Sequence, residues 1–339
     1  MKAIRIIRPY ELEICEVDEP KIEHSNEVII KVTSGGICGS DIGIFNGTNS
    51  LATYPRIIGH EFGGIVVEKG QDVKEIKIGD YVAVDPVISC GHCYACRIGR
   101  HNVCANLEAM GVHRDGGFSE FVKVNKGNVH RFKSKFDTSL LALVEPYSIG
   151  MQINYRGQIS EGDKVLIIGS GAIGLCTLNV AKNNGAKVLI ADIVEEKLKV
   201  AEEMGADQTV LVGKESLQKV ADEFSNGEGM PVVVDTVCNT SSFEGAIEIA
   251  SPAGRVVVIG LTSEPSQIVQ ADITKKELTI IGSRLNCNRF DEVIKAFEAG
   301  KLSPELIKTH VFDFRKAEDA LNLILNKPEE VIKAVLDFN

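Results

Sequence analysis

In the second half of the chain, short apolar runs alternate with amphipathic stretches. The runs predict buried strands at residues 164–168, 187–191, 208–212, 231–235, 255–259 and 278–281. Helical patterns lie between most of them, notably at residues 195–204, 215–224 and 242–249. Parallel strands need crossover connections and are buried on both faces, so this rhythm predicts a doubly wound parallel sheet.

The first half has a different pattern, because β-type runs are separated by glycine turns and helical patterns are scarce. The runs lie at residues 1–6, 12–17, 28–33, 64–68, 81–84 and 118–124. They predict an irregular antiparallel sheet or partial barrel. A helical stretch begins at Pro146, a residue suited to a helix start, and leads to the second half.

The last part of the chain carries helical patterns at residues 289–299 and 315–325 and a final strand at 333–338. We expect this tail to return to the first domain. The predicted parts are a catalytic domain at residues 1–150, a dinucleotide-binding domain at 151–286 and the C-terminal return at 287–339. A chain of 339 residues is long enough for two domains, each with its own core.

A glycine turn follows the first strand of the second half directly. In such turns Gly169 permits the tight turn, Gly171 lets the backbone approach a pyrophosphate, and Gly174 lets helix and strand pack closely. The next helix offers unpaired N–H groups and a partial positive charge to phosphates. Dinucleotide binding is favoured over a purely structural turn. The predicted cofactor-binding residues are Gly169, Gly171, Ala172, Ile173, Gly174 and Asp192.

Asp192 ends the second of these strands, where a carboxylate accepts hydrogen bonds from an adenosine ribose. A 2′-phosphate beside it would be repelled by roughly 1–4 kcal/mol. Ile193 and Val194 supply no compensating cation, although Lys197 is near in sequence. The predicted cofactor is therefore NAD rather than NADP.

The composition is that of an ordinary globular protein, with 44% hydrophobic and 25% charged residues. A net charge of −10 argues against a nucleic-acid partner, which needs a basic surface. The N-terminal segment alternates like a strand and turns acidic, unlike a secretory signal. No apolar run approaches the ~20 residues of a membrane span. We expect a cytoplasmic protein with no membrane partner.

Four of the nine cysteines are clustered, with the spacing C-x₂-C-x₂-C-x₇-C. In a cytosolic chain of this length such a cluster favours metal binding over disulfides. Four thiolates match a closed tetrahedral zinc site; an iron–sulfur cluster uses the same donors, but nothing else suggests electron transfer. We predict a structural zinc on Cys90, Cys93, Cys96 and Cys104, with His92 and His101 as bystanders. The other unpaired cysteines are expected to be small buried side chains, namely Cys15, Cys176, Cys238 and Cys287.

Four further metal-ligand candidates are dispersed: Cys38 in Gly-Ile-Cys-Gly-Ser-Asp, the pair His60-Glu61, and Glu145 before Pro146. Their spacing alone does not bring them together. Taken singly, Cys38 fits a core position and Glu145 fits the acid at a helix start.

The chain resembles the zinc-containing medium-chain dehydrogenases over essentially its whole length. The resemblance rests on the pattern Gly59-His60-Glu61-x₂-Gly64-x₅-Gly70, the four-cysteine lobe and the glycine turn, in that order. Glu145-Pro146 is similar to the sorbitol and threonine dehydrogenase branch. The resemblance implies a GroES-like catalytic domain beside a Rossmann domain, and two zinc ions per chain. It also implies a catalytic zinc on Cys38 and His60, with carboxylate ligands from Glu61 and Glu145 that bind directly or, for one of them, through water.

A closer resemblance covers AVDPVISCGHCYACRIG, GVHRDGGFSEF, KELTIIGSRLN and KTHVFDF. These stretches are similar to the starvation-sensing B-type proteins and to L-gulonate 5-dehydrogenases. The resemblance implies oxidation of a secondary alcohol, with zinc as the Lewis acid and NAD as the hydride acceptor. By the same resemblance Ser40 takes the hydroxyl proton, unless it only caps a turn. Many relatives carry a histidine five positions after the cysteine, where this chain has Gly43.

A sugar acid needs a cation for its carboxylate, and a neutral polyol does not. Arg284 follows the sixth predicted strand, where ligands of such sheets gather, and His113 is a weaker candidate on the other domain. The alternative role of Arg284 is a structural salt bridge. The best-supported function is L-gulonate 5-dehydrogenase, working as a homodimer or homotetramer. The alternatives are a polyol, L-galactonate, L-idonate or L-threonine dehydrogenase, and an NAD-binding regulatory zinc protein.

Overall fold

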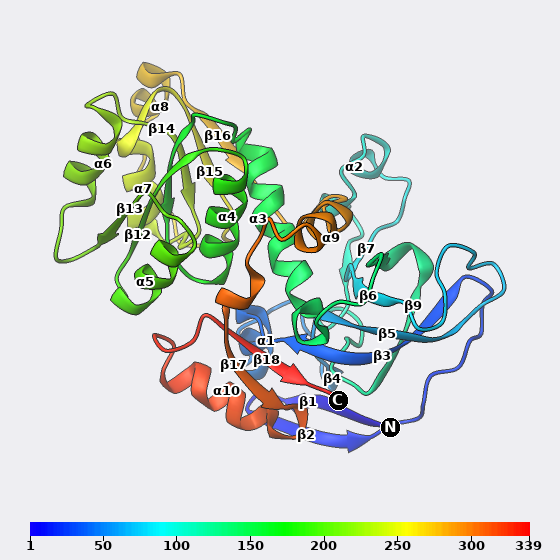
Figure 1. The fold of residues 1–339 in the computed structure, drawn as a ribbon. Coiled ribbons are helices and arrows are strands. Elements are labelled where there is room, and N and C mark those ends of the chain that lie inside the picture. The colour runs from blue at the N-terminus through cyan, green and yellow to red at the C-terminus, as the bar shows by residue number, and fades with distance from the viewer. The chain divides into compact units, whose positions relative to one another are not determined.

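The computed structural model describes residues 1–339, which fold into two compact units (Figure 1). The first unit comprises Met1–Glu145, Phe290–Gly300 and Lys308–Asn339. The second comprises Pro146–Arg289 and Lys301–Ile307. Both ends of the chain therefore belong to the first unit. None of the helices has the length and apolar character that crossing a bilayer requires.

The second unit is built on a six-stranded parallel sheet in the order β13-β12-β11-β14-β15-β16. The order reverses between β11 and β14, which confirms the predicted doubly wound sheet. Both central strands are apolar and almost wholly buried, as a sheet covered on both faces requires. The strands are β11 (Lys164–Ile168), β12 (Lys187–Asp192), β13 (Gln208–Leu211), β14 (Met230–Asp235), β15 (Ala250–Val258) and β16 (Thr279–Gly282).

Local sequence explains where the helices of this unit begin and end. The Asn239 side chain accepts the Ser242 N–H at 2.8 Å and so caps α7. Ser216 caps α6, and Asn226 ends it in the left-handed conformation. Figure 1 shows these helices flanking the sheet. They are α3 (Val144–Gly157), α4 (Ala172–Asn183), α5 (Glu195–Glu203), α6 (Leu217–Ser225), α7 (Thr240–Ile249) and α8 (Gln270–Lys276).

The first unit is mainly antiparallel. It contains a seven-stranded sheet, in which β9 pairs with β3 beside the path β10-β6-β5-β3-β18-β17, and smaller sheets β2-β1-β4 and β7-β8. Apolar residues of the two larger sheets share one core. The strands of its N-terminal part are β1 (Lys2–Arg8), β2 (Glu11–Glu16), β3 (Glu27–Gly36), β4 (Arg56–Ile57), β5 (Glu61–Lys69), β6 (Tyr81–Val84), β7 (Val87–Ile88), β8 (Glu108–Ala109), β9 (Phe121–Asn125) and β10 (Val129–Arg131).

The C-terminal segment joins this unit through strand pairing and aromatic packing. Strand β18 (Lys333–Asp337) lies antiparallel to β3 and parallel to β17 (Lys308–Asp313), and Figure 1 shows it in red beside the blue β3. The Phe338 ring stacks on Phe314 at 4.6 Å between centroids and lies 6.3 Å from Phe118. The remaining helices of this segment are α9 (Phe290–Glu298) and α10 (Ala317–Asn326).

Some elements differ from the prediction. Strand β17 was not predicted, although its partly buried and exposed positions alternate. The short helices α1 (Gly39–Phe45) and α2 (Tyr94–Arg97) were not predicted because each is too short to show a clear period. The remaining turns of helix are 3₁₀ segments at His101–Val103, Lys126–Asn128, Thr138–Leu143, Pro304–Leu306 and Phe314–Lys316.

Cys15 and Cys176 are buried as predicted, but Cys238 and Cys287 are partly exposed. Cys238 lies in the turn after β14, where its sulfur accepts the Gly260 N–H at 2.9 Å.

Candidate active site

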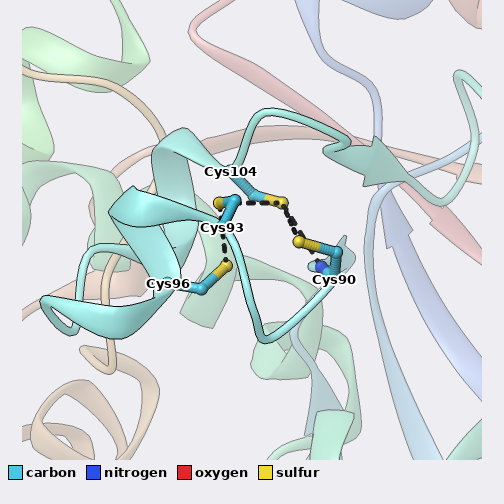
Figure 2. A group of neighbouring side chains, drawn as sticks. All are labelled: Cys90, Cys93, Cys96 and Cys104. Carbon is cyan, nitrogen blue, oxygen red and sulfur yellow. Dashed lines mark hydrogen bonds between the residues drawn. The ribbon is translucent and has the colours of Figure 1, made fainter.

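The four clustered cysteines converge on one point, as Figure 2 shows. Cys93 Sγ lies 3.5 Å from Cys96 Sγ and 3.9 Å from Cys104 Sγ, and the Cys104 and Cys90 sulfurs are 3.4 Å apart. Four thiolates bound tetrahedrally at about 2.3 Å would lie about 3.8 Å from one another. The sulfur positions therefore fit a single zinc ion.

Backbone N–H groups stabilise negative charge on these sulfurs. The N–H groups of Cys90 and Asn106 both point to Cys104 Sγ at 3.3 Å. Hydrogen bonds from the backbone of Ala105 and Cys96 lower the pKa of Cys93 to about 6. The His92 ring contacts the Cys90 carbonyl oxygen at 2.8 Å. Burial raises the pKa of Cys96 to about 11, so a metal bound in this lobe would have to displace the proton of that thiol.

A second set of ligand atoms belongs to Cys38, His60 and Glu61, all within 4.8 Å of one another. Cys38 precedes helix α1, and His60 and Glu61 stand at the start of β5. These segments meet because β3 pairs with β5 and brings Gly36 opposite Glu61. Sulfur, imidazole nitrogen and carboxylate oxygen are all ligands of zinc, so the donor set fits this metal.

Asp41 orients the first two of these groups. This fully buried carboxylate accepts the Cys38 N–H at 2.9 Å and lies 3.6 Å from His60 Nδ1. A carboxylate behind a histidine ring is the arrangement that orients metal-binding imidazoles. The other ring nitrogen, Nε2, lies 3.4 Å from Ser40 Oγ. The predicted catalytic hydroxyl is therefore next to the proposed ligand atom of His60.

Two further ionisable groups are buried nearby. Lys333 contacts both carboxylate oxygens of Glu61, at 2.7 and 2.8 Å. Glu145, at the start of α3, is 5% exposed. Burial and the neighbouring charge of Glu61 raise the pKa of Glu145 to about 8. Glu145 is not among the three residues whose ligand atoms lie within 4.8 Å.

The charges of the site are balanced within the protein, since Lys333 pairs with Glu61 and His60 lies beside Asp41. Burial lowers the pKa of His60, but the charges of Asp41 and Cys38 raise it well above its usual value. His60 Nδ1 is buried and makes no hydrogen bond. A divalent metal bound here would take the place of the proton on His60, because zinc binds neutral imidazole nitrogen together with sulfur and carboxylate oxygen.

The glycine turn after β11 has the steric features that a dinucleotide-binding turn requires. Gly169 has φ +98°, and a Cβ on Gly174 would lie 1.9 Å from the Gly169 carbonyl oxygen. Gly171 precedes α4, and Ala172 and Ile173 form the first turn of this helix. The N–H groups at the start of α4 can therefore face a pyrophosphate.

Asp192 is held by the backbone at the end of β12. Its oxygens accept the Ser170 N–H at 2.6 Å and the Val194 N–H at 2.9 Å. Beside it lies a cavity of about 300 Å³, whose lining includes Ile193, Val212 and Val237. These apolar residues were missed from the sequence, because they lie after three different strands and share no motif. The cavity offers an apolar surface next to the carboxylate that is predicted to bind the ribose.

The two predicted substrate residues lie in different units. Arg284 is exposed and directly follows β16 and Ser283. His113 is partly exposed in the first unit, and its Nδ1 accepts the Ala109 N–H at 3.1 Å. The His113 ring is therefore already hydrogen-bonded within its own loop.

Changing Cys96 to Ser should remove one zinc ion per chain and lower the free energy of unfolding by roughly 3 kcal/mol or more, because the metal contributes folding energy. Metal analysis and thermal unfolding measure both effects. The control Cys287→Ser should keep both metals. An unchanged zinc content in Cys96→Ser would refute the assignment of the lobe.

Changing Asp192 to Ala should weaken NAD binding by about tenfold and narrow the preference over NADP, since a ribose acceptor and a repulsive charge are both lost. Dissociation constants for the two cofactors measure the change. Glu196→Ala, which removes the same charge from an exposed position nearby, should leave the preference intact. Equal affinity of the unmutated protein for NAD and NADP would contradict the role of Asp192.

Comparison with known proteins identifies both halves of the chain. Residues 24–134 match the alcohol dehydrogenase GroES-like domain, and residues 172–299 match the zinc-binding dehydrogenase family. The starvation-sensing protein RspB of Escherichia coli is 41% identical, with 100% of each chain covered. L-galactonate-5-dehydrogenase of the same species is 32% identical, with 94% of each chain covered.

A solved structure agrees with these relationships. The alcohol dehydrogenase RspB from Escherichia coli, in complex with NADH, superposes with a TM-score of 0.94 at 40% identity, covering 99% of each chain. The fold, the two sets of metal-ligand side chains and the dinucleotide turn thus occur together in one chain. The protein belongs to the family of zinc-binding, NAD-dependent alcohol dehydrogenases.

Proposed function

We propose that this enzyme oxidises a secondary alcohol of a sugar acid to a ketone, with L-gulonate oxidised at C5 as the best candidate. The observation that carries the proposal is the meeting of Cys38, His60 and Glu61 beside the Ser40 hydroxyl. Asp192 at the end of β12 supports NAD as the hydride acceptor. The likeness to L-galactonate-5-dehydrogenase supports a sugar acid as the substrate.

Cys38 and His60 would hold the catalytic metal, and Glu61 and Glu145 would supply carboxylate oxygens. Cys90, Cys93, Cys96 and Cys104 would hold the structural metal. When bound, the catalytic zinc polarises the substrate oxygen and NAD accepts the hydride. Side chains of the protein would position the substrate and take up the proton of its hydroxyl group.

Ser40 would accept the proton of the substrate hydroxyl. Its Oγ is 3.4 Å from His60 Nε2, so a substrate oxygen placed beside His60 would be within reach of the serine. Asp41 would keep His60 in place through its Nδ1 side. The two buried carboxylates nearby keep this region polar, and Lys333 balances the charge of Glu61.

Gly43 has no side chain that could carry the proton away from Ser40. A Cβ on Gly43 would meet Asn49 Cβ at 3.4 Å and Thr48 Oγ1 at 3.5 Å, which are ordinary contacts. The position can therefore take a small side chain without strain. With no titratable group there, we propose that water and the ribose of the cofactor carry the proton past this position.

Arg284 would bind the carboxylate of the substrate. It follows β16 at the edge of the sheet where ligands of parallel sheets gather. The backbone beside it is unusual, since Leu285 has φ +49° and Asn288 has φ +59°. Such conformations in non-glycine residues cluster at functional sites, which supports a binding role for this segment.

Two alternatives remain open to experiment. A polyol dehydrogenase would use the same metal and cofactor without a carboxylate-binding arginine, and an L-threonine dehydrogenase would have to bind an ammonium group as well as a carboxylate. A regulatory protein would bind NADH and turn over no substrate. A panel of sugar acids, polyols and L-threonine with NAD separates them, because turnover on L-gulonate or a close epimer is the expected result. Turnover on neutral polyols alone would refute the sugar-acid assignment, and no turnover at all would favour the regulatory alternative.

Changing Ser40 to Ala should lower kcat by about 100-fold or more, because the acceptor of the substrate proton is lost. The matched control is Gly43→Ala in the same helix, which should leave kcat within a few-fold of the original, since its Cβ is accommodated. Steady-state kinetics at several pH values measure both variants. Equal effects of the two substitutions would show that the proton leaves by another route.

Changing Arg284 to Met should raise KM for L-gulonate by about tenfold or more, because charge-assisted hydrogen bonds contribute roughly 1.5–3 kcal/mol each. KM for a neutral polyol serves as the internal control and should change little. Arg284→Lys should lie between the two, since it keeps the charge and loses the planar fork. Equal losses on acid and polyol would assign Arg284 a structural role.

A further inference from the structure

Lys333 is a buried lysine whose contacts all lie inside the first unit. It opens strand β18 and is 3% exposed. Its Nζ lies 2.7 Å from Glu61 Oε1 and 2.8 Å from Oε2, and it also donates to the Ile37 carbonyl oxygen at 3.2 Å. An ammonium has three protons to donate, and these three contacts can satisfy all of them.

These contacts reach both segments that carry the proposed metal ligands. Ile37 immediately precedes Cys38, and Glu61 immediately follows His60. The position of the lysine is set by the backbone, because the Ile37 N–H donates to the Ala334 carbonyl oxygen at 2.9 Å. The strand pairing of β18 with β3 thus places a fixed cation behind the metal site.

The Glu61 carboxylate has little freedom on its other side. A Cβ on Gly36 would lie 2.3 Å from Glu61 Oε2, so the carboxylate is packed against the backbone of β3. Lys333 contacts both oxygens, and therefore competes with a metal for their lone pairs. A carboxylate whose charge is already balanced attracts a divalent cation less strongly than a free one.

We propose that Lys333 is a positioning residue of the active site, which keeps Glu61 a weak, charge-balanced ligand and so limits how tightly the site holds its zinc. This role rests on the proposed assignment of zinc to Cys38 and His60. Cys38 and His60 then provide the firm attachment, and Glu61 leaves coordination space for a substrate oxygen. The C-terminal strand thereby regulates a metal site whose ligands come from the N-terminal half.

The test is the rate at which the holoenzyme loses zinc to an excess of chelator. The catalytic zinc is the ion whose release abolishes activity. Lys333→Met should lower the rate of this release by about tenfold or more, because residues that contact metal ligands typically change metal affinity by about 10- to 100-fold. Release from the four-cysteine lobe is the internal reference, because Lys333 does not touch it. Lys308→Met, on the adjacent strand β17, is the matched control and should release zinc at the original rate.

Further variants separate charge from packing. Lys333→Arg keeps the charge and should release zinc at close to the original rate. The double variant Lys333→Met with Glu61→Gln removes both charges. Its zinc release should therefore no longer be slowed as it is in Lys333→Met alone. If Lys333→Met fails to fold, Lys333→Gln should show the same slowing, because it loses the charge and keeps a hydrogen-bonding side chain.

The outcomes distinguish this inference from the function on which it rests. An unmutated enzyme with one zinc per chain, located in the lobe, would overturn the proposed catalytic zinc site. Two zinc ions per chain with unchanged or faster release in the folded Lys333→Met variant would overturn the role of Lys333 alone. Faster release would mean that Lys333 only supports the packing of the ligands.

Discussion

The ion pair between Lys333 and Glu61 is the interaction on which the proposed active site of the first unit depends. Lys333 is 3% exposed and contacts both oxygens of the buried Glu61 carboxylate. Breaking a buried ion pair leaves an unpaired buried charge, which costs several kcal/mol. The pairing of β18 with β3 holds the lysine in place, so the position of Glu61 beside His60 depends on the C-terminal strand.

The two proposed metal sites of the chain differ in their donors and in their surroundings. In the lobe all four donors are thiolates from one short segment, and backbone N–H groups stabilise their charge. Such a site is closed and holds a loop in place. The second site mixes sulfur, nitrogen and carboxylate oxygen, and one of its oxygen donors is shared with Lys333. Because Glu61 also pairs with Lys333, it would bind the metal only weakly. A coordination position would then remain for a substrate oxygen, which catalysis requires.

The cofactor half depends on sterics more than on charge. The close approach of Gly174 to the Gly169 carbonyl oxygen excludes any side chain at that position. Asp192 accepts two backbone N–H groups, so its carboxylate is oriented before a ribose arrives. Preorganisation of this kind lowers the entropic cost of binding. The apolar cavity beside it adds contact area without adding specificity for one phosphate pattern.

The sequence alone determined those features whose residues are close together along the chain. The glycine turn, Asp192 and the four cysteines each lie in one short segment, so their spacing restricts their geometry. The site of Cys38, His60 and Glu61 needed a resemblance to known proteins, because nothing local shows that helix α1 and strand β5 meet. Lys333 was not predicted at all. Its pairing with Glu61 exists only because β18 adds to the edge of β3, and strand pairing between distant segments is decided by the packing of the whole unit.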